Sequence, residues 1–219
     1  MSILIFGSGS ALTKRMKDKL LKNNRPCEIA GRKNADYFFD ANHHATDVFR
    51  AINVKKHTYF IVNLGILFPK KISEQSLEEI TCSLNVNLIS IVQICEFILN
   101  NNKNAKVFIL GSESGLKGSY DTTYFLCKAA LRAYVRERKL DGENQQLLLF
   151  SPSTISDAGM TTRRTDLEVL ENYRRKHPKR RFLTCDEVSD IIISFMNEKF
   201  SYVSNTEIEI NGGKFARMK

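Results

Sequence analysis

Short apolar runs alternate with stretches of helical periodicity along almost the whole chain, and this alternation limits the possible folds more than any other feature. Five runs have the length and composition of buried strands; they are SILIF, CEIAG, YFIVNLG, KVFILG and QLLLF, which begin at residues 2, 27, 59, 106 and 146. DYFFD at 36–40 is a weaker candidate, and TEIEING at 206–212 is a last strand. Strands separated by helices predict βαβ units and a parallel sheet. We therefore expect an α/β fold with a doubly wound, mostly parallel sheet of the Rossmann type.

The helices between these strands are marked by apolar residues at helical spacing. Residues 12–20 and 123–139 show this periodicity. Thr184 and Glu187 form a capping box, which predicts the start of the helix before the last strand. We see no linker, repeat or low-complexity segment, so we expect a single domain over residues 1–219.

One segment, at residues 84–99, is apolar nearly all round. A helix of this kind is buried on most of its sides, either in a core or at a contact between subunits. We therefore expect a homodimer or a homotetramer that pairs through this helix.

Composition argues against several classes of protein. Hydrophobic residues make up 42% of the chain, which is enough for a core without disulfide bonds. The five cysteines are scattered and form no C-x-x-C pair, so we expect no disulfide framework and no metal site. Apolar runs are shorter than the roughly 18 residues that span a bilayer, and the first run is too short for a signal peptide. The expectation is a cytoplasmic protein without a membrane partner.

Positive charge is concentrated in one part of the chain. The net charge is +9, and residues 163–181 contain eight lysines and arginines but only three acidic residues. Such a segment favours an anionic partner, although a cationic helix that only faces water has the same composition. Only Tyr173 and Phe182 supply aromatic side chains there, so we do not expect nucleic acid as the partner.

A glycine-rich turn follows the first strand. Gly7 and Gly9 occupy the first two positions of the G-x-G-x-x-G pattern, whereas Leu12 stands at the third. In that pattern the backbone approaches a dinucleotide pyrophosphate at a helix N-terminus. An ordinary turn between a strand and a helix uses the same glycines. The position of the motif on the first strand favours a dinucleotide site.

Two cations end the second strand. A site for NAD has an acidic residue at this place, to bind the ribose 2′-hydroxyl. This chain has Arg32 and Lys33, which suit a 2′-phosphate. We expect NADP as the cofactor in preference to NAD, which remains an alternative, as does a surface role for both cations.

Several segments, in the correct order along the chain, resemble motifs of the short-chain dehydrogenase/reductase family, and in particular its members that resemble 3-oxoacyl-carrier-protein reductases. GSGSALT at 7–13 stands at the glycine turn of the family, IVNLG at 61–65 at its N-N-A-G strand end, and LNVNLIS at 84–90 at its asparagine helix. ILGSESG at 109–115 resembles the strand that ends in the catalytic serine, YFLCK at 124–128 matches Y-x-x-x-K, and FSPSTISDAGMT at 150–161 resembles its P-G segment. LTCDEVSDIIISFM at 183–196 and TEIEINGG at 206–213 are similar to the closing helix and the D-G-G strand of the family.

The tyrosine and lysine of this motif suggest the chemistry. Tyr124 and Lys128 are one helical turn apart and share a face. A phenol with an ordinary pKa of about 10 exchanges protons poorly near pH 7, and a nearby ammonium group lowers that pKa. Tyr124 is thus the expected general acid or base, and Lys128 the group that adjusts its pKa. The resemblance implies that Lys128 also holds the nicotinamide ribose, that Ser112 binds the substrate carbonyl, and that Asn87 holds a helix and a relay water.

The resemblance also implies a set of cofactor contacts in the turn, at the strand ends and on the catalytic helix. These residues are Gly7, Ser8, Gly9, Ala11, Leu12, Arg32, Lys33, Asp40, Asn63, Gly65, Tyr124, Lys128 and Pro152.

The chain departs from the family pattern at several of these places. Ala11 and Thr13 replace the second and third glycines, and Ser153 replaces the glycine after Pro152. Ser112 lies three residues before Gly115, as the catalytic serine does in the family, but one residue closer to the tyrosine, so Ser114 is an alternative. The residues that replace the glycines of the turn affect the affinity expected for the cofactor. A non-catalytic, dinucleotide-binding regulatory protein is therefore the alternative to an NADP(H)-dependent oxidoreductase.

The resemblance places a substrate lid at about residues 153–183, which includes the basic segment. We therefore expect an anionic substrate: a nucleotide-sugar, a phosphate, a CoA thioester or a carrier-protein ester. The chemistry expected is reduction of a carbonyl or oxidation of a secondary alcohol.

Overall fold

The centre of the molecule is one twisted sheet in which every strand pair is parallel. A computed structural model describes residues 2–43 and 46–215 of the chain. Within them seven strands are ordered β3-β2-β1-β4-β5-β6-β7. Their bounds are β1 Ile3–Phe6, β2 Cys27–Gly31, β3 Tyr37–Phe38, β4 Tyr59–Val62, β5 Lys106–Leu110, β6 Gln146–Pro152 and β7 Thr206–Ile210. The strand order reverses between β1 and β4, which is where a doubly wound sheet binds its ligands. The predicted α/β fold class is confirmed.

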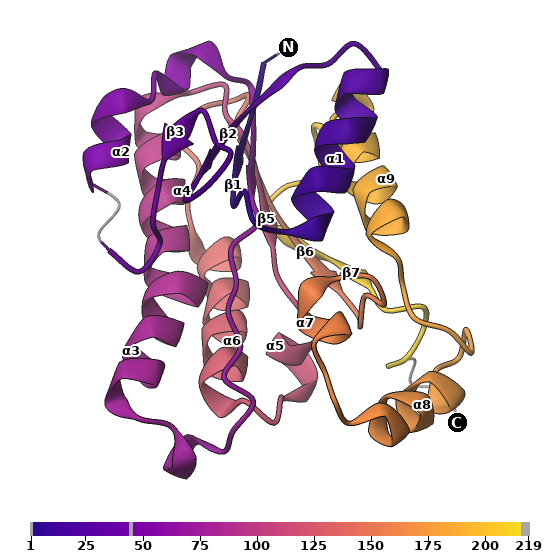
Figure 1. The fold of residues 1–219 in the computed structure, drawn as a ribbon. Helices are drawn as coiled ribbons and strands as arrows, with labels where there is room; N and C mark the ends of the chain where they lie inside the picture. Colours follow the sequence, from indigo (N-terminus) through magenta and orange to yellow (C-terminus); the bar gives the residue numbers. More distant parts are fainter. Residues whose placement is uncertain (1, 44–45, 216–219) are drawn as a thin grey trace.

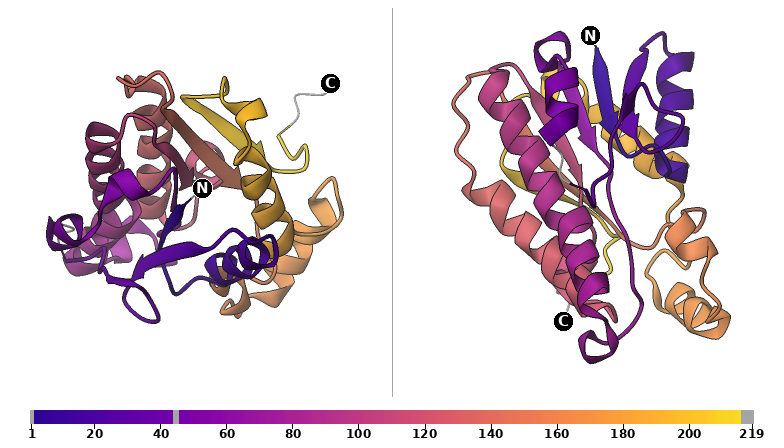
Figure 2. Two further views of the ribbon diagram at one scale, coloured as in Figure 1. Left: turned by 90° about the horizontal axis from the view of Figure 1, so that it is seen from above. Right: turned by 60° about the vertical axis from the view of Figure 1, so that its left-hand side comes forward.

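Helices cover both faces of the sheet (Figures 1 and 2). One face carries α1 (Ala11–Lys22) and α9 (Cys185–Phe195); the other carries α2 (Thr46–Ala51), α4 (Ser90–Asn101) and α6 (Thr122–Glu137). Shorter elements are α3 (Leu77–Leu84), α5 (Ser114–Lys117), α7 (Gly159–Thr162), α8 (Leu167–Lys176), a π-turn (Asn85–Ile89) and the 3₁₀ turns Val54–Lys56, Ile72–Glu74 and Glu198–Phe200.

Each face of the sheet has its own hydrophobic core. In β1, Leu4 and Phe6 pack toward α4 and α6, whereas Ile3 and Ile5 pack toward α1 and α9. All four are fully buried. A strand covered on both faces must be apolar at every position, and for this reason these strands read as continuous apolar runs rather than alternating ones.

The apolar helix of the sequence is longer than its periodicity suggests. It starts at Leu77, where Ser76 and Glu79 form a capping box, and it continues through the π-turn to Asn101. These 25 residues have enough length and apolar character to cross a bilayer, with a mean hydropathy of 1.7 in their best window. In this structure α4 packs on the sheet and α3 packs against α6, and 44% of that window is buried. The rest of its surface includes the exposed side chains of Leu77 and Ile89.

The expected lid segment forms a separate lobe at the lower right of Figure 1. A single bridge between Ile155 and Leu183 closes it at its base. Helix α8 contains no buried residue, so packing against the sheet does not hold it in place. It lies beside the carboxyl ends of the strands (Figure 1).

Candidate active site

Tyr124, Ser112 and Lys128 come together beyond the carboxyl end of β5. Strand β5 ends at Leu110, and Gly111 follows because an added Cβ would lie 2.6 Å from Oγ of Ser151. Ser112 is the next residue. Tyr124 lies in the first turn of α6, and its side chain is 7% exposed. The fold therefore brings the loop after β5 against the start of α6, which places the serine beside the tyrosine.

Burial raises the pKa of the Tyr124 phenol to about 12. Hydrogen bonding by the Ser112 side chain acts in the opposite direction and lowers this pKa, while the charge of Asp121, and at high pH that of the Cys127 thiolate, raise it. The backbone N–H of Ser114 donates to Oγ of Ser112 at 3.1 Å, so Ser114 lies behind Ser112. Of the two serines, Ser112 is the one whose side chain lowers the pKa of the phenol.

Lys128 is 2% exposed and lies under the tyrosine. Its Nζ donates to the carbonyl oxygens of Leu110 at 3.1 Å and of Leu64 at 3.4 Å, and lies 5.6 Å from the centre of the Tyr124 ring. Burial lowers the pKa of Lys128 to about 8, so at pH 7 the ammonium form still dominates. The expected lowering of the Tyr124 pKa by Lys128 is not seen in this structure: burial is the largest cause acting on the phenol and raises its pKa, and the ammonium is bonded to backbone carbonyls.

Asn87 anchors the loop that follows β4. It is fully buried in the π-turn, where its Oδ1 accepts from the N–H of Ile66 and its Nδ2 donates to the carbonyl of Ile66, both at 3.0 Å. The same amide donates to Oγ of Ser83 at 3.0 Å. Asn87 thus joins the helix to the loop through a paired, two-way contact.

Gly7 is required by the geometry of the turn after β1. Its φ is +110°, and a Cβ there would lie 2.2 Å from the carbonyl oxygen of Asn63. Gly9 is exposed and faces open space, and Ser10 caps α1 by accepting from the N–H of Leu12 at 3.1 Å. The turn therefore leaves the N-terminus of α1 open to an anion, as a dinucleotide pyrophosphate requires. Ala11 is exposed there, whereas Leu12 is buried.

Thr13, which replaces a glycine of the family, is buried and makes two hydrogen bonds. Its Oγ1 donates to the carbonyl of Gly7 at 2.6 Å and accepts from Nδ2 of Asn63 at 2.9 Å. The threonine therefore links the turn to the end of β4. Sequence reasoning treated this position only as a lost glycine, and no local signal indicates its two partners.

The two cations at the end of β2 are exposed beside the turn. Gly31 precedes them because a Cβ would lie 2.3 Å from Oγ of Ser8. The N–H of Lys33 donates to that Oγ at 3.5 Å, so Ser8, Arg32 and Lys33 lie next to one another. The turn and the cations form a surface that suits a phosphorylated ribose.

The remaining predicted contacts lie at the ends of other strands. Asp40 accepts from the N–H of Asn42 at 3.0 Å. Pro152 is the buried last residue of β6, and its carbonyl accepts from the N–H of Glu113 at 3.0 Å.

The first helix of the lid reaches the site. A Cβ on Gly65 would lie 3.1 Å from Cε of Met160, which belongs to α7, and 3.5 Å from Oδ1 of Asn87. The predicted lid segment therefore contacts the loop after β4, although nothing in the sequence pattern singles out Met160.

Several cations of the lid are already paired. Arg164 pairs with Asp166, Arg174 with Glu171 at 2.6 Å and Arg181 with Glu187 at 2.6 Å; all three pairs are bidentate. Arg175, Lys176 and Lys179 are exposed. The positive surface is therefore narrower than residues 163–181 suggest, and it is centred on the C-terminal end of α8.

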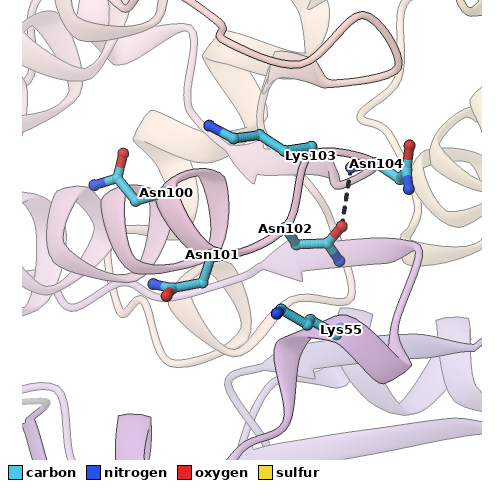
Figure 3. A pocket seen from close by; sticks show the side chains of 6 residues that line it. All are labelled: Lys55, Asn100, Asn101, Asn102, Lys103 and Asn104. Carbon is cyan, nitrogen blue, oxygen red and sulfur yellow. Dashed lines mark hydrogen bonds between the residues drawn. The ribbon is translucent and has the colours of Figure 1, made fainter.

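Two open hollows occur away from the tyrosine. One is lined by Leu167, Glu168, Glu171 and Arg175 on α8. The other lies between the end of α4 and the start of β5, and is lined by Lys55 and residues 100–104 (Figure 3). There the Asn102 amide is already bonded to the carbonyls of Val54 and His57, both at 2.8 Å. This second hollow lies at the amino end of β5, whereas Tyr124 lies beyond its carboxyl end. The hydrogen bonds of Asn102 stabilise the fold there.

Comparison with known proteins gives a consistent assignment. Residues 11–214 match a family model described as enoyl-(acyl carrier protein) reductase. The chain is 27% identical over 161 residues to the 3-oxoacyl-[acyl-carrier-protein] reductase FabG of Buchnera aphidicola subsp. Baizongia pistaciae (strain Bp). This alignment covers 71% of the chain and 65% of the relative, so the chain spans just under two thirds of that protein's length.

Solved structures show the same fold. The chain is similar to an oxidoreductase of the short-chain dehydrogenase/reductase family from Burkholderia thailandensis, with a TM-score of 0.85, 16% identity, and coverage of 98% of this chain and 92% of that one. It is also similar to ElxO with NADP bound, with a TM-score of 0.84, 19% identity and coverage of 99% of both chains. At these identities the likeness concerns the fold.

Proposed function

This chain belongs to the short-chain dehydrogenase/reductase family of oxidoreductases, and from that membership we propose that it is an NADP(H)-dependent enzyme that reduces a carbonyl or oxidises a secondary alcohol. The observation that carries this proposal is the juxtaposition of Tyr124, Ser112 and Lys128 at the carboxyl end of β5. The experiment that tests it is an assay of NADPH oxidation with a panel of carbonyl compounds, with the Tyr124→Phe variant beside the wild type.

The residues present fit a dinucleotide. The open turn at Gly9 and the free N-terminus of α1 suit the pyrophosphate, and Arg32 and Lys33 suit a 2′-phosphate. When bound, the dinucleotide supplies or accepts the hydride. Two structural neighbours, ElxO and actinorhodin polyketide ketoreductase, are described with NADP or NADPH, which supports the same cofactor here.

The protein residues supply the proton. With a pKa of about 12, the Tyr124 phenol is protonated near neutral pH and carries the proton for the carbonyl oxygen, although it is a weaker acid than an ordinary phenol. The Ser112 hydroxyl, which lowers the pKa of this phenol, orients the same carbonyl. Lys128, held by two backbone carbonyls, supplies a buried positive charge beside the oxygen that gains negative charge.

The cofactor preference is the first testable consequence. We expect NADPH to bind at least tenfold more tightly than NADH, which corresponds to about 1.4 kcal/mol, because only NADPH carries the 2′-phosphate that Arg32 and Lys33 would bind. Fluorescence titration measures both affinities. Replacing both residues by alanine should remove the preference, whereas Lys22→Ala, an exposed cation at the end of α1, should not change it. Equal affinities for the two cofactors in the wild type would reject the assignment.

We propose that residues 153–183 form a lid that receives an anionic substrate. The name of the Buchnera relative indicates a carrier-protein ester, and the exposed cations at the end of α8 suit such a carrier, a CoA thioester, a nucleotide-sugar or a phosphate.

Charge reversal on α8 tests this. The double variant Arg175→Glu and Lys176→Glu should raise KM for an anionic substrate about tenfold and leave the affinity for NADPH unchanged, since the charges lie on the lid. Lys55→Glu, at the opposite edge of the sheet, is the matched control. The same KM in the double variant and the wild type would mean that the cations only face water.

We also propose a homodimer or homotetramer in the cytoplasm. The helix Leu77–Asn101 keeps an apolar outer surface, and Leu126 on α6 is 49% exposed. Burying this surface between two copies is favourable. Light scattering should therefore give a mass of at least twice 25.1 kDa. A mass of one chain at micromolar concentration would contradict the proposal.

The alternative is a dinucleotide-binding regulatory protein that does not catalyse a reaction. The altered turn favours it, since Ala11 and Thr13 stand in place of glycines. Tight NADPH binding without activity on any carbonyl or alcohol would support this alternative.

A further inference from the structure

Asp121 is a buried carboxylate at the start of the helix that carries Tyr124. It is 1% exposed and is the N-cap of α6. Its Oδ1 accepts from the backbone N–H of Tyr124 at 2.9 Å and from Nε2 of Gln75 at 2.9 Å, and its Oδ2 accepts from the N–H of Phe68 at 2.7 Å. An N-cap on a surface helix needs only the first of these contacts. The other two reach across to the loop that follows β4.

Gln75 completes this connection. It is 8% exposed, and its Nε2 also donates to the carbonyls of Phe68 at 3.0 Å and Lys70 at 3.3 Å. Its Oε1 accepts from Oγ1 of Thr123 at 2.6 Å. The side chain is therefore bonded to the loop at one end and to the first turn of α6 at the other. Such a fully bonded buried network is rigid.

The same loop is tied down elsewhere by groups of the candidate site. Asn87 holds Ile66 through two hydrogen bonds, and Lys128 donates to the carbonyl of Leu64. Asp121 and Gln75 hold the part of the loop that comes next along the chain. Their contacts set the position of the loop relative to Tyr124.

The surroundings of the phenol contain few other charges. Cys127 and Lys128 approach from α6 itself, and Ser112 approaches from the loop after β5. Lys128 bonds to backbone carbonyls, and Ser112 and the Cys127 thiol are neutral at neutral pH. Asp121 is thus the carboxylate whose charge acts on Tyr124, where it raises the pKa of the phenol.

We infer that Asp121 and Gln75 are positioning residues for Tyr124: they lock the start of α6 to the loop after β4, and they hold a negative charge one helical turn from the phenol. The inference rests on the proposed function of Tyr124 as the proton donor. A charge there holds the proton more tightly on the phenol, which makes the phenol a weaker proton donor and its phenolate a stronger base. It acts in the direction opposite to that expected of Lys128.

Asp121→Asn is the sharpest variant, because asparagine also caps a helix well but carries no charge. The titration of Tyr124 is followed by ¹⁹F NMR in protein labelled with 3-fluorotyrosine, with the Tyr124 signal identified by its loss in Tyr124→Phe. We expect its midpoint in Asp121→Asn to fall by about one pH unit. Glu137→Gln, which removes the same charge at the other end of α6, should leave the midpoint unchanged. Coincident curves for Asp121→Asn and the wild type would overturn the inference.

If Asp121→Asn does not fold, Asp121→Ser retains a capping oxygen without the charge and takes its place in the titration. Gln75→Met tests the connection between the loop after β4 and the start of α6. In this variant kcat should fall about tenfold with unchanged affinity for NADPH, and a kcat equal to that of the wild type would overturn the positioning role of Gln75.

The proposed function and the present inference fail in different ways. An inactive wild type with a shifted Tyr124 midpoint in Asp121→Asn rejects the proposed function and keeps the charge effect, whereas an active wild type with coincident curves rejects the inference alone.

Discussion

Replacing Tyr124 by phenylalanine is expected to lower kcat for carbonyl reduction by a factor of about 10² to 10⁴, which is the usual contribution of general acid catalysis. The change removes one oxygen from a side chain that is 7% exposed, so the ring keeps its place in the fold. NADPH affinity should therefore remain within a few-fold of the wild type, while single-turnover kinetics should show that the chemical step has slowed.

The same helix offers a matched control for this variant. Tyr134 lies ten positions further along α6, and its hydroxyl donates to Oε1 of Glu96 at 2.6 Å, away from the candidate site. Tyr134→Phe removes the same atom and should leave kcat unchanged. If Tyr124→Phe keeps most of the activity, the phenol is not the proton donor.

Lys128→Met is expected to lower kcat by at least about 10²-fold and to weaken NADPH binding about tenfold, because it removes a buried positive charge that lies beside the phenol. The structure adds a second expectation, which concerns stability. A buried ammonium costs desolvation free energy, so an apolar side chain of similar length should not lower the melting temperature much. A loss of activity together with an unchanged melting temperature would separate a functional role from a structural one.

The pH dependence of stability gives an independent check on this lysine. The pKa of Lys128 is about 8 in the folded protein, below its value of about 10.4 in an unfolded chain. Between these values the unfolded state binds more protons, so this residue makes the protein more stable as pH rises from about 8 to about 10. The contribution of this residue to the free energy of unfolding increases by on the order of 3 kcal/mol over the full window.

Chemical denaturation measures this effect. The free energy of unfolding is determined for the wild type and for Lys128→Met at about pH 7.5 and about pH 10, near the ends of this window, and the change with pH is compared between the two proteins. The comparison is needed because burial raises the pKa of several thiols, which lowers stability over the same range in both proteins. Parallel pH profiles for the two proteins would show that Lys128 titrates normally and is not desolvated.

Much of this protein follows from local sequence pattern. Apolar runs without alternation predict strands that are covered on both faces, and β1 is buried on both sides for this reason. The spacing of Tyr124 and Lys128 predicts that they share a helix face, because the helical repeat fixes the relative directions of side chains four positions apart. The fold class and the place of the tyrosine therefore come from the chain itself.

Only the tertiary structure decides which distant groups become partners. Thr13 bonds to Asn63, Lys128 to the carbonyl of Leu64, and Asp121 to Gln75, over separations of 50, 64 and 46 residues. No periodicity encodes such pairs, since they depend on how the turns and loops pack once the sheet has formed. The same holds for pKa values: the sequence places a lysine near a phenol, but burial, which only the packed fold decides, makes the phenol less acidic and lowers the pKa of the lysine.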